Sequence, residues 1–314
     1  MDKIIFFNMN QLGDLLFSLP VIKAVRELFP DIKIYSVIRK NLADLLNETK
    51  LVDKIFIKEK CLKSRIKLIS DIRKEKIDTA CMFSESPETL ITAFFSKIKT
   101  RVGFKTASLN FLLTDKAEKK GVPYLTNNIA LAKKLGIKDI KTDYLNIIKI
   151  NSETEKKNDI WLQNNNFENK KFVVISMGAS KRRQEKCLKN EVWIETVNKL
   201  LKQNIAVIVV GAVWEKNDIN KTINNCDIKP TVFCPEGGLI ELAGLLKKAS
   251  LFIGIDSGTM HLAAALGVKC IALYGNTDPT QIGPQPVDKH IIIKKDSAKQ
   301  ITADDILYKI NFEI

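Results

Sequence analysis

The chain has 314 residues, of which 45% are apolar and 27% are charged. This length favours two domains, because a single hydrophobic core rarely grows beyond about 250–300 residues. The composition is that of a globular protein and excludes a disordered or fibrous chain. Fifty Lys and Arg against 36 Asp and Glu give a formal net charge of +14. A diffuse surface charge, an anionic membrane or substrate, and nucleic acid are the three explanations to weigh.

Arginine supplies few of the cations, which argues against nucleic acid. Only seven of the fifty are Arg, whereas base readout relies on the fork geometry of the guanidinium group. The Lys residues are scattered over the whole length. We therefore expect no nucleic-acid partner and interpret most of the charge as solvated surface.

The cysteines show no metal-binding pattern. All six are widely spaced without a Cys-x-x-Cys pair, and the chain has only two histidines, His261 and His290. Because a structural zinc site needs clustered ligands, we expect no metal and no cofactor. Free thiols in apolar runs and the lack of a signal-peptide pattern favour the cytoplasm. The longest apolar run, 205–214, is too short to span a bilayer.

Strands and helices alternate in the first half of the chain. Apolar runs predict strands at 3–7, 32–38, 54–57, 78–83 and 100–104. Helical periodicity appears at 14–29, 42–47, 62–74 and 87–98. Parallel strands need such crossover helices, so the alternation indicates a parallel sheet. The pattern lapses over 105–151, apart from a helix predicted at 126–135.

The alternation resumes after a polar stretch, 152–166, which we interpret as a linker leading into a first helix of the second domain. Strands are predicted at 172–176, 205–210, 231–233, 251–255 and 269–274, and helices at 191–202, 215–224, 239–248 and 259–266. We thus predict two Rossmann-like, doubly wound α/β domains, 1–151 and 152–314, that face a central cleft at the carboxyl ends of their strands. Packing of the last helix back on the first domain stays open.

The strongest motif follows the predicted strand 251–255 and reads Asp256-Ser-Gly-Thr-Met-His261. The free N–H groups and positive dipole at the start of the next helix make an anion site. Its glycine spacing matches neither the dinucleotide fingerprint, the Walker loop nor the hydrolase elbow. Two simpler explanations remain, namely helix capping by Asp256 and Ser257, and a core role for His261.

Two further motifs follow the first predicted strand of each domain. Asp14 stands at the start of the first helix, either as its N-cap or as a general base that faces the cleft. In the second domain, the segment 176–193 carries five cations before its helix. It is either a surface charge run or a basic loop over a diphosphate.

These motifs, in this order, resemble the ADP-heptose:lipopolysaccharide heptosyltransferases of glycosyltransferase family 9. The resemblance spans essentially the whole chain and rests on three blocks, 11–20, 178–193 and 256–279. It implies a glycosyltransferase B fold, in which the N-terminal domain binds the acceptor and the C-terminal domain binds the nucleotide sugar without a metal.

The resemblance also implies a role for each matching residue. Asp14 would be the catalytic base, Lys186 would stabilise the diphosphate leaving group, and Glu215 would contact the nucleotide ribose. The residues implied around the diphosphate and sugar are Asp256, Ser257, Gly258, Thr259 and His261, with Ser180 and Lys181 as further candidates. Lys63, Arg65 and Arg101 are candidates for holding the acceptor.

The implied reaction is an inverting, metal-independent transfer of heptose from ADP-heptose to a lipopolysaccharide core acceptor. A helix N-terminus and Lys186 would stabilise the leaving group in place of a divalent ion, and one base is enough for a single displacement. A lipid-linked acceptor would bring the cytoplasmic protein to the anionic inner face of the membrane as a peripheral partner. The alternatives are another nucleotide-sugar donor, or a non-catalytic module that binds nucleotide sugars.

Overall fold

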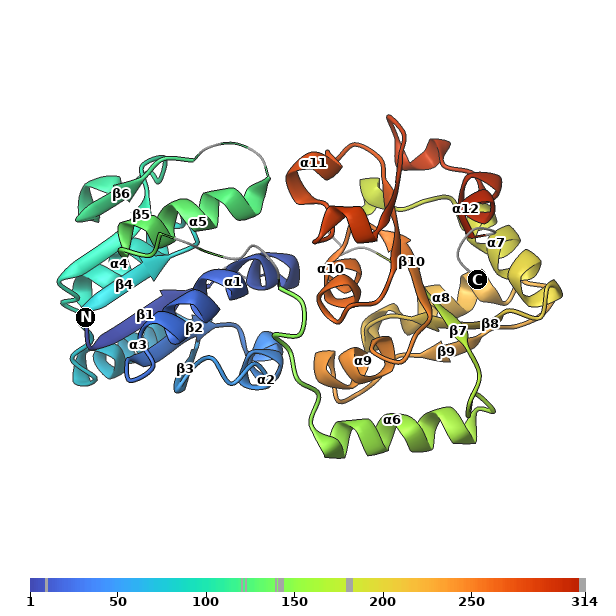
Figure 1. Ribbon diagram of the computed structural model, residues 1–314, viewed down its shortest axis with the longest axis horizontal. Coiled ribbons are helices and arrows are strands. Elements are labelled where there is room, and N and C mark those ends of the chain that lie inside the picture. The colour runs from blue at the N-terminus through green and yellow to red at the C-terminus, as the bar shows by residue number, and fades with distance from the viewer. Residues whose placement is uncertain are drawn as a thin grey trace. The chain divides into compact units, whose positions relative to one another are not determined.

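The structure is a computed structural model that describes residues 1–8, 11–119, 121, 123–138, 140, 144–178 and 183–310 (Figure 1). The chain divides into two compact units, Met1–Ile147 and Ile148–Ile314. Each unit is built on a six-stranded parallel sheet with helices in the crossovers. The prediction of two doubly wound α/β halves is therefore confirmed.

In unit 1 the strand order is β3-β2-β1-β4-β5-β6. The strands are β1 (Lys3–Phe7), β2 (Lys33–Ile38), β3 (Lys54–Ile57), β4 (Thr79–Met82), β5 (Thr100–Phe104) and β6 (Asp115–Ala117). The helices are α1 (Leu12–Leu28), α2 (Lys40–Asn47), α3 (Leu62–Lys74), α4 (Pro87–Phe95) and α5 (Tyr124–Lys134), with a 3-10 turn η1 (Asn110–Leu112). The strand order reverses between β1 and β4. In doubly wound sheets, ligands bind at the carboxyl ends of the two strands where the order reverses.

In unit 2 the strand order is β12-β11-β10-β7-β8-β9. The strands are β7 (Phe172–Ser176), β8 (Ala206–Val210), β9 (Thr231–Phe233), β10 (Leu251–Ile255), β11 (Cys270–Tyr274) and β12 (Ile291–Lys294). The helices are α6 (Ser152–Asn164), α7 (Asn190–Lys202), α8 (Lys216–Ile223), α9 (Leu239–Leu246), α10 (Gly258–Ala265), α11 (Pro279–Ile282) and α12 (Ala303–Ile310). The 3-10 turns are η2 (Gln184–Lys186), η3 (Val213–Glu215), η4 (Val287–Lys289) and η5 (Ala298–Gln300). Here the order reverses between β7 and β10.

The central strands are apolar along both faces. Ile4, Ile5 and Phe6 of β1 and Phe252 and Ile253 of β10 are fully buried. A parallel sheet covered by helices on both sides requires such unbroken apolar runs, because no strand face meets water. This rigid frame holds the carboxyl ends of β1, β7 and β10, where the motifs of the sequence lie.

The polar stretch after residue 151, predicted as a linker leading into a helix, is itself the helix α6. Asn151 caps it by accepting the N–H of Thr154 at 2.8 Å. Its Trp161 ring packs on Phe233 with centroids 4.6 Å apart. Helix α12 packs against α7 within unit 2, with Lys199 Nζ 3.0 Å from Asp304 Oδ1. The strands β6 and β12 were not predicted from the sequence.

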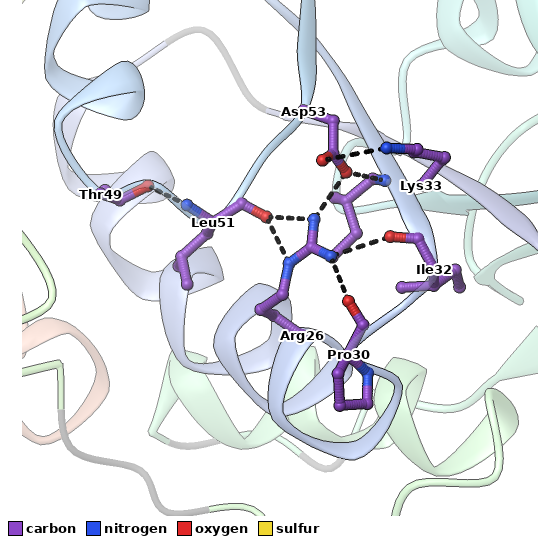
Figure 2. A network of polar contacts seen from close by, with 8 residues as sticks. Arg26, Pro30, Ile32, Lys33, Thr49, Leu51 and Asp53 are labelled. Carbon is purple, nitrogen blue, oxygen red and sulfur yellow. Dashed lines mark hydrogen bonds and ion pairs between the residues drawn. The ribbon is translucent and has the colours of Figure 1, made fainter.

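Arg26, in the last turn of α1, binds the segments that lead into β2 and β3 at the amino ends of these strands (Figure 2). Its guanidinium group donates to the carbonyls of Pro30 (3.0 Å), Ile32 (2.8 Å) and Leu51 (3.3 Å) and lies 2.6 Å from Asp53 Oδ2. Burial disfavours the Asp53 carboxylate, but the Ile34 N–H and Arg26 outweigh it and lower the pKa of Asp53. This network closes the α1–β2 turn at the edge opposite Asp14.

Replacing Arg26 with Ala should destabilise the protein by about 2 kcal/mol or more, because partly buried carbonyls and a carboxylate lose their donors together. Denaturant unfolding followed by circular dichroism measures this change. The matched control is Lys23→Ala on the same helix, whose exposed ion pair with Glu27 spans 3.7 Å and should contribute less than about 1 kcal/mol. Equal midpoints for the two variants would contradict the proposed tie.

Candidate active site

In unit 2, the loop that the sequence predicts to bind an anion lies between β10 and α10. Ser257 is the N-cap of α10 in an extended conformation, and its hydroxyl accepts the N–H of Met260 at 3.4 Å. Its carbonyl accepts the N–H of His261 at 3.2 Å. Gly258 and Thr259 form the first turn of α10, at the positive end of the helix dipole. Backbone N–H groups at such a terminus bind phosphate oxygens without a metal.

Lys186 meets this loop directly. Its Nζ lies 2.5 Å from Asp256 Oδ2 and 3.4 Å from the Asp256 carbonyl oxygen. The side chains of Lys186 and Asp256 are only 13% and 5% exposed, so the pair is largely shielded from water. An ammonium group has three N–H donors. Lys186 uses two of them on Asp256, so a third N–H can still be donated to an anion. The tertiary structure thus joins two motifs that lie 70 residues apart.

His261 lies beneath the same carboxylate. It is buried, as a core role predicts, and its Nε2 lies 3.9 Å from Asp256 Oδ1. Burial lowers the pKa of His261 to about 4. The negative charge of Asp256 raises this pKa, and the positive charge of Lys186 lowers it further. The imidazole is therefore neutral at neutral pH, so it can hydrogen-bond a ligand but does not add positive charge.

Glu215 lies in η3, which follows β8, the strand next to β7 in the sheet. Its Oε2 accepts the N–H of Ala212 at 2.8 Å. A Cβ at position 178 would fall 2.3 Å from Glu215 Oε1, so glycine at the end of β7 leaves the space that this carboxylate occupies. Burial raises the pKa of Glu215 although the Ala212 N–H opposes it. Because β10, β7 and β8 are adjacent, Asp256, Lys186 and Glu215 lie along one edge of the sheet.

Three other residues of the sequence blocks need separate mention. Ser180 and Lys181 lie outside the described residues. Asp278, in the block after β11, caps the short helix α11 by accepting the N–H of Thr280 at 2.9 Å. That capping role accounts for Asp278 structurally.

In unit 1, Asp14 lies in the first turn of α1 and is partly buried. The N-cap is Gln11, so the N-cap interpretation of Asp14 was wrong. Burial raises the pKa of Asp14 to about 6. Its charge and that of Glu85 add to burial in raising the pKa of Tyr124. A carboxylate with a pKa near the working pH is suited to general base catalysis.

A buried polar cluster beneath α1 was not predicted from the sequence. Asn8 Nδ2 donates to Ser36 Oγ at 2.6 Å, and Ser18 Oγ donates to Asn8 Oδ1 at 2.9 Å. All three side chains are buried. They join the carboxyl end of β1 to β2 and to the second turn of α1, the helix that carries Asp14. A polar residue immediately after a buried strand was the signal that could have found Asn8.

Two of the candidate acceptor cations are already engaged in the fold. Arg65 Nε lies 2.9 Å from Glu88 Oε1. Arg101 Nε donates to the carbonyl of Leu112 at 2.6 Å, and its Nη1 donates to that of Lys99 at 3.1 Å. Lys63 is exposed on α3. These contacts give Arg65 and Arg101 structural roles in unit 1.

Within the described ranges, no cluster of three or more His, Cys, Asp or Glu side chains could hold a metal ion. In the same part of the chain, no helix is both long and apolar enough to cross a membrane.

Comparison with known proteins identifies the family to which this fold and these motifs belong. The family model of glycosyltransferase family 9 (heptosyltransferase) matches residues 65–309. This chain belongs to glycosyltransferase family 9. The lipopolysaccharide heptosyltransferase 3 of Escherichia coli is 23% identical over 282 residues, which cover 85% of this chain and 81% of that protein. A putative glycosyltransferase of Haemophilus influenzae is 23% identical and covers all of this chain and 97% of its own.

Solved structures of the family share the fold. The E. coli ADP-heptose lps heptosyltransferase II has a TM-score of 0.84 at 19% identity and covers 99% of this chain and 98% of its own. The E. coli heptosyltransferase WaaC with ADP has a TM-score of 0.81 at 17% identity, covering 99% of this chain and 100% of its own. The predicted glycosyltransferase B fold is thus confirmed, and the protein is a glycosyltransferase of the heptosyltransferase family.

The matched family span includes Lys186, Glu215 and the loop 256–261, but it begins after Asp14. The assignment of Asp14 therefore depends on its position in α1, its burial and its raised pKa.

A double-mutant cycle should detect the Lys186–Asp256 pair. Lys186→Gln leaves a buried carboxylate without its partner and should cost about 3–5 kcal/mol, with Asp256→Asn costly for the reciprocal reason. The double variant should be more stable than the sum of the single effects by about 1–3 kcal/mol. Denaturant unfolding of the four proteins measures the coupling.

The control cycle uses Lys247 and Glu155, whose exposed ion pair spans 3.1 Å in the same unit. Their coupling should stay below about 1 kcal/mol. Equal coupling in the two cycles would show that Lys186 and Asp256 do not form a shielded pair in solution.

Proposed function

We propose that the protein transfers heptose from ADP-heptose to a lipopolysaccharide core acceptor by an inverting, metal-independent displacement. The observation that carries the proposal is the meeting of Lys186, Asp256 and the N-terminus of α10 at the carboxyl ends of adjacent strands. Family membership supports the transferase class, and two relatives are described as a heptosyltransferase with ADP and an ADP-heptose heptosyltransferase.

The donor half of the reaction falls to unit 2. The diphosphate would lie on the N–H groups of Gly258 and Thr259, with the ammonium group of Lys186 as its cation. As the bond between the anomeric carbon and the phosphate oxygen breaks, negative charge grows on the departing diphosphate. Fixed N–H dipoles and a shielded ammonium group stabilise that charge without reorganising. Glu215 would accept hydrogen bonds from the ribose hydroxyls, and neutral His261 would orient the loop or contact the sugar.

The acceptor half falls to unit 1. The acceptor hydroxyl oxygen forms the new bond to the anomeric carbon from the side opposite the leaving group, and its proton passes to the Asp14 carboxylate. One carboxylate is enough for this step, in contrast to the two that glycoside hydrolysis uses. A lipid-linked acceptor would bring the cytoplasmic protein to an anionic membrane surface as a peripheral partner.

Asp14→Asn tests the base directly. The amide keeps the shape of the side chain but cannot accept the proton, so kcat should fall by at least about 10²-fold. The affinity for ADP should not change, because the donor residues belong to unit 2. Product formation measured by mass spectrometry and ADP binding measured by calorimetry separate the two effects, with exposed Asp31→Asn as the control.

The same residue sets the pH dependence. With a raised pKa of about 6, Asp14 is protonated below that pH and cannot act as a base. The wild-type kcat/KM should therefore rise as the pH passes upward through about 6. Unchanged turnover in Asp14→Asn would remove the base assignment.

A nucleotide-sugar panel tests the donor and the two alternatives. A ligand at 100 times its Kd stabilises the fold by about 2.7 kcal/mol, so ADP-heptose should raise the unfolding midpoint more than UDP- or GDP-sugars. Transfer should persist in the presence of a chelator, because no step uses a divalent ion. A larger shift with another nucleotide sugar would change the donor. Donor binding without turnover on any acceptor would favour a non-catalytic module.

A further inference from the structure

One face of unit 1 exposes apolar side chains that a soluble fold ordinarily buries. On α4, Ile91, Phe94 and Phe95 are 38%, 45% and 54% exposed. They recur at helical spacing, so they form one stripe. The opposite side of α4 packs on the sheet through Leu90 and Ala93. The stripe is therefore a second apolar face on a helix whose core face is already satisfied.

The neighbouring helix α3 repeats this arrangement. Leu62 and Ile66 lie one turn apart and are 70% and 62% exposed. They alternate with the exposed cations Lys63 and Lys67, so the outer surface of α3 mixes long aliphatic and basic side chains.

Contacts join these residues into one surface. Helices α3 and α4 pack together. Arg65 Nε lies 2.9 Å from Glu88 Oε1 near their N-terminal ends, and Arg73 Nη2 donates to the carbonyl of Phe95 at 2.8 Å near their C-terminal ends. The turn η1 packs on α4 and exposes Phe111, which is 73% accessible. Arg101 lies 5.6 Å over the Phe94 ring and binds the Leu112 carbonyl, which links η1 to the stripe.

We name this surface the α3–α4 face, and its members are Leu62, Ile66, Ile91, Phe94, Phe95 and Phe111. Cations surround it. Helix α3 carries five Lys and Arg against the single carboxylate of Asp71, which lies 3.1 Å from Lys74. Lys97 and Lys99 follow α4 and are exposed. The acidic group within the face, Glu88, is neutralised by Lys58 at 3.0 Å and by Arg65.

We propose that the α3–α4 face binds the interfacial region of a bilayer that contains anionic lipids. Phe, Leu and Ile side chains would enter the boundary between headgroups and acyl chains, and the surrounding Lys and Arg would meet the lipid phosphates. The proposal assigns a surface to the membrane contact of the proposed function, but it does not depend on the donor or on the transfer step.

The charge pattern favours a membrane over a second copy of this chain. A two-fold dimer through this face would place cations against cations, and like charges opposite one another oppose association. A bilayer with anionic headgroups complements both the apolar side chains of the face, through its acyl chains, and the surrounding cations, through its phosphates. A bare cationic surface would suit nucleic acid, but exposed Leu, Ile and Phe gain nothing from a phosphate backbone.

The test is co-sedimentation of the full-length protein with vesicles. Wild-type protein should bind vesicles of phosphatidylglycerol and phosphatidylethanolamine at least about tenfold more tightly than phosphatidylcholine vesicles, and less tightly as ionic strength rises. Phe95→Ser/Phe111→Ser should weaken binding by at least about tenfold through lost apolar contact. Lys67→Gln/Lys99→Gln should weaken it several-fold, only on anionic vesicles.

The matched control is Ile160→Ser/Tyr308→Ser, which removes two side chains that are 58% and 62% exposed in unit 2 and should bind vesicles like wild type. Unfolding midpoints confirm that every variant folds. Transfer to a detergent-free, soluble acceptor should be equal in all of them, so loss of vesicle binding is separable from failure of the proposed function.

Three outcomes would overturn the proposal. Wild-type protein would fail to bind anionic vesicles, or Phe95→Ser/Phe111→Ser would bind as well as wild type. Alternatively, light scattering would show a wild-type dimer that Phe95→Ser/Phe111→Ser abolishes, which would assign the face to a second copy of the chain.

Discussion

The candidate site of unit 2 depends on one shielded ion pair. Lys186 and Asp256 meet at 2.5 Å with little exposure to water. A buried carboxylate without its cation is strongly destabilising, so each group holds the other in place. The pair lies where α10 begins, so the ammonium group is added to the positive end of a helix dipole. The positive charge at this strand end therefore belongs to the fold itself.

The surrounding structure keeps this pair in position. Parallel order brings the ends of β10, β7 and β8 to one edge, and continuous apolar burial keeps those strands rigid. Gly178 leaves room for the Glu215 carboxylate beside the same edge. Neutral His261 fills the space beneath Asp256 without adding a charge that would compete with Lys186. In unit 1, the Asn8–Ser18–Ser36 cluster ties the second turn of the helix that carries Asp14 to the sheet.

The two units use charge in different ways. In unit 2 the important charges are shielded and paired, which suits a defined phosphate geometry. On α3 of unit 1 the cations are exposed and interleaved with Leu62 and Ile66, which suits a fluid anionic surface. Arg26 belongs to neither group, because its donors serve the α1–β2 turn, the Leu51 carbonyl and Asp53. The net charge of +14 thus includes cations in structural networks, cations in shielded pairs and cations on the exposed surface.

The sequence by itself determined the alternation of strands and helices, because apolar runs and helical periodicity are local patterns. It also placed the loop 256–261 at a strand end, since a polar turn between a buried strand and a helix has few other positions. The stretch 152–164 was predicted only as a linker leading into a helix. Its polar composition hides the capping by Asn151 and the packing through Trp161 that make all of it helical.

Only the tertiary structure decided which of these residues act together. Lys186 and Asp256 are 70 residues apart and meet because β7 and β10 are neighbours in the sheet. The third position of Asp14 in α1, and its raised pKa, follow from where the helix begins and what covers it. The apolar stripe on α4 was invisible as well, because both faces of that helix are apolar and only packing shows which one remains exposed.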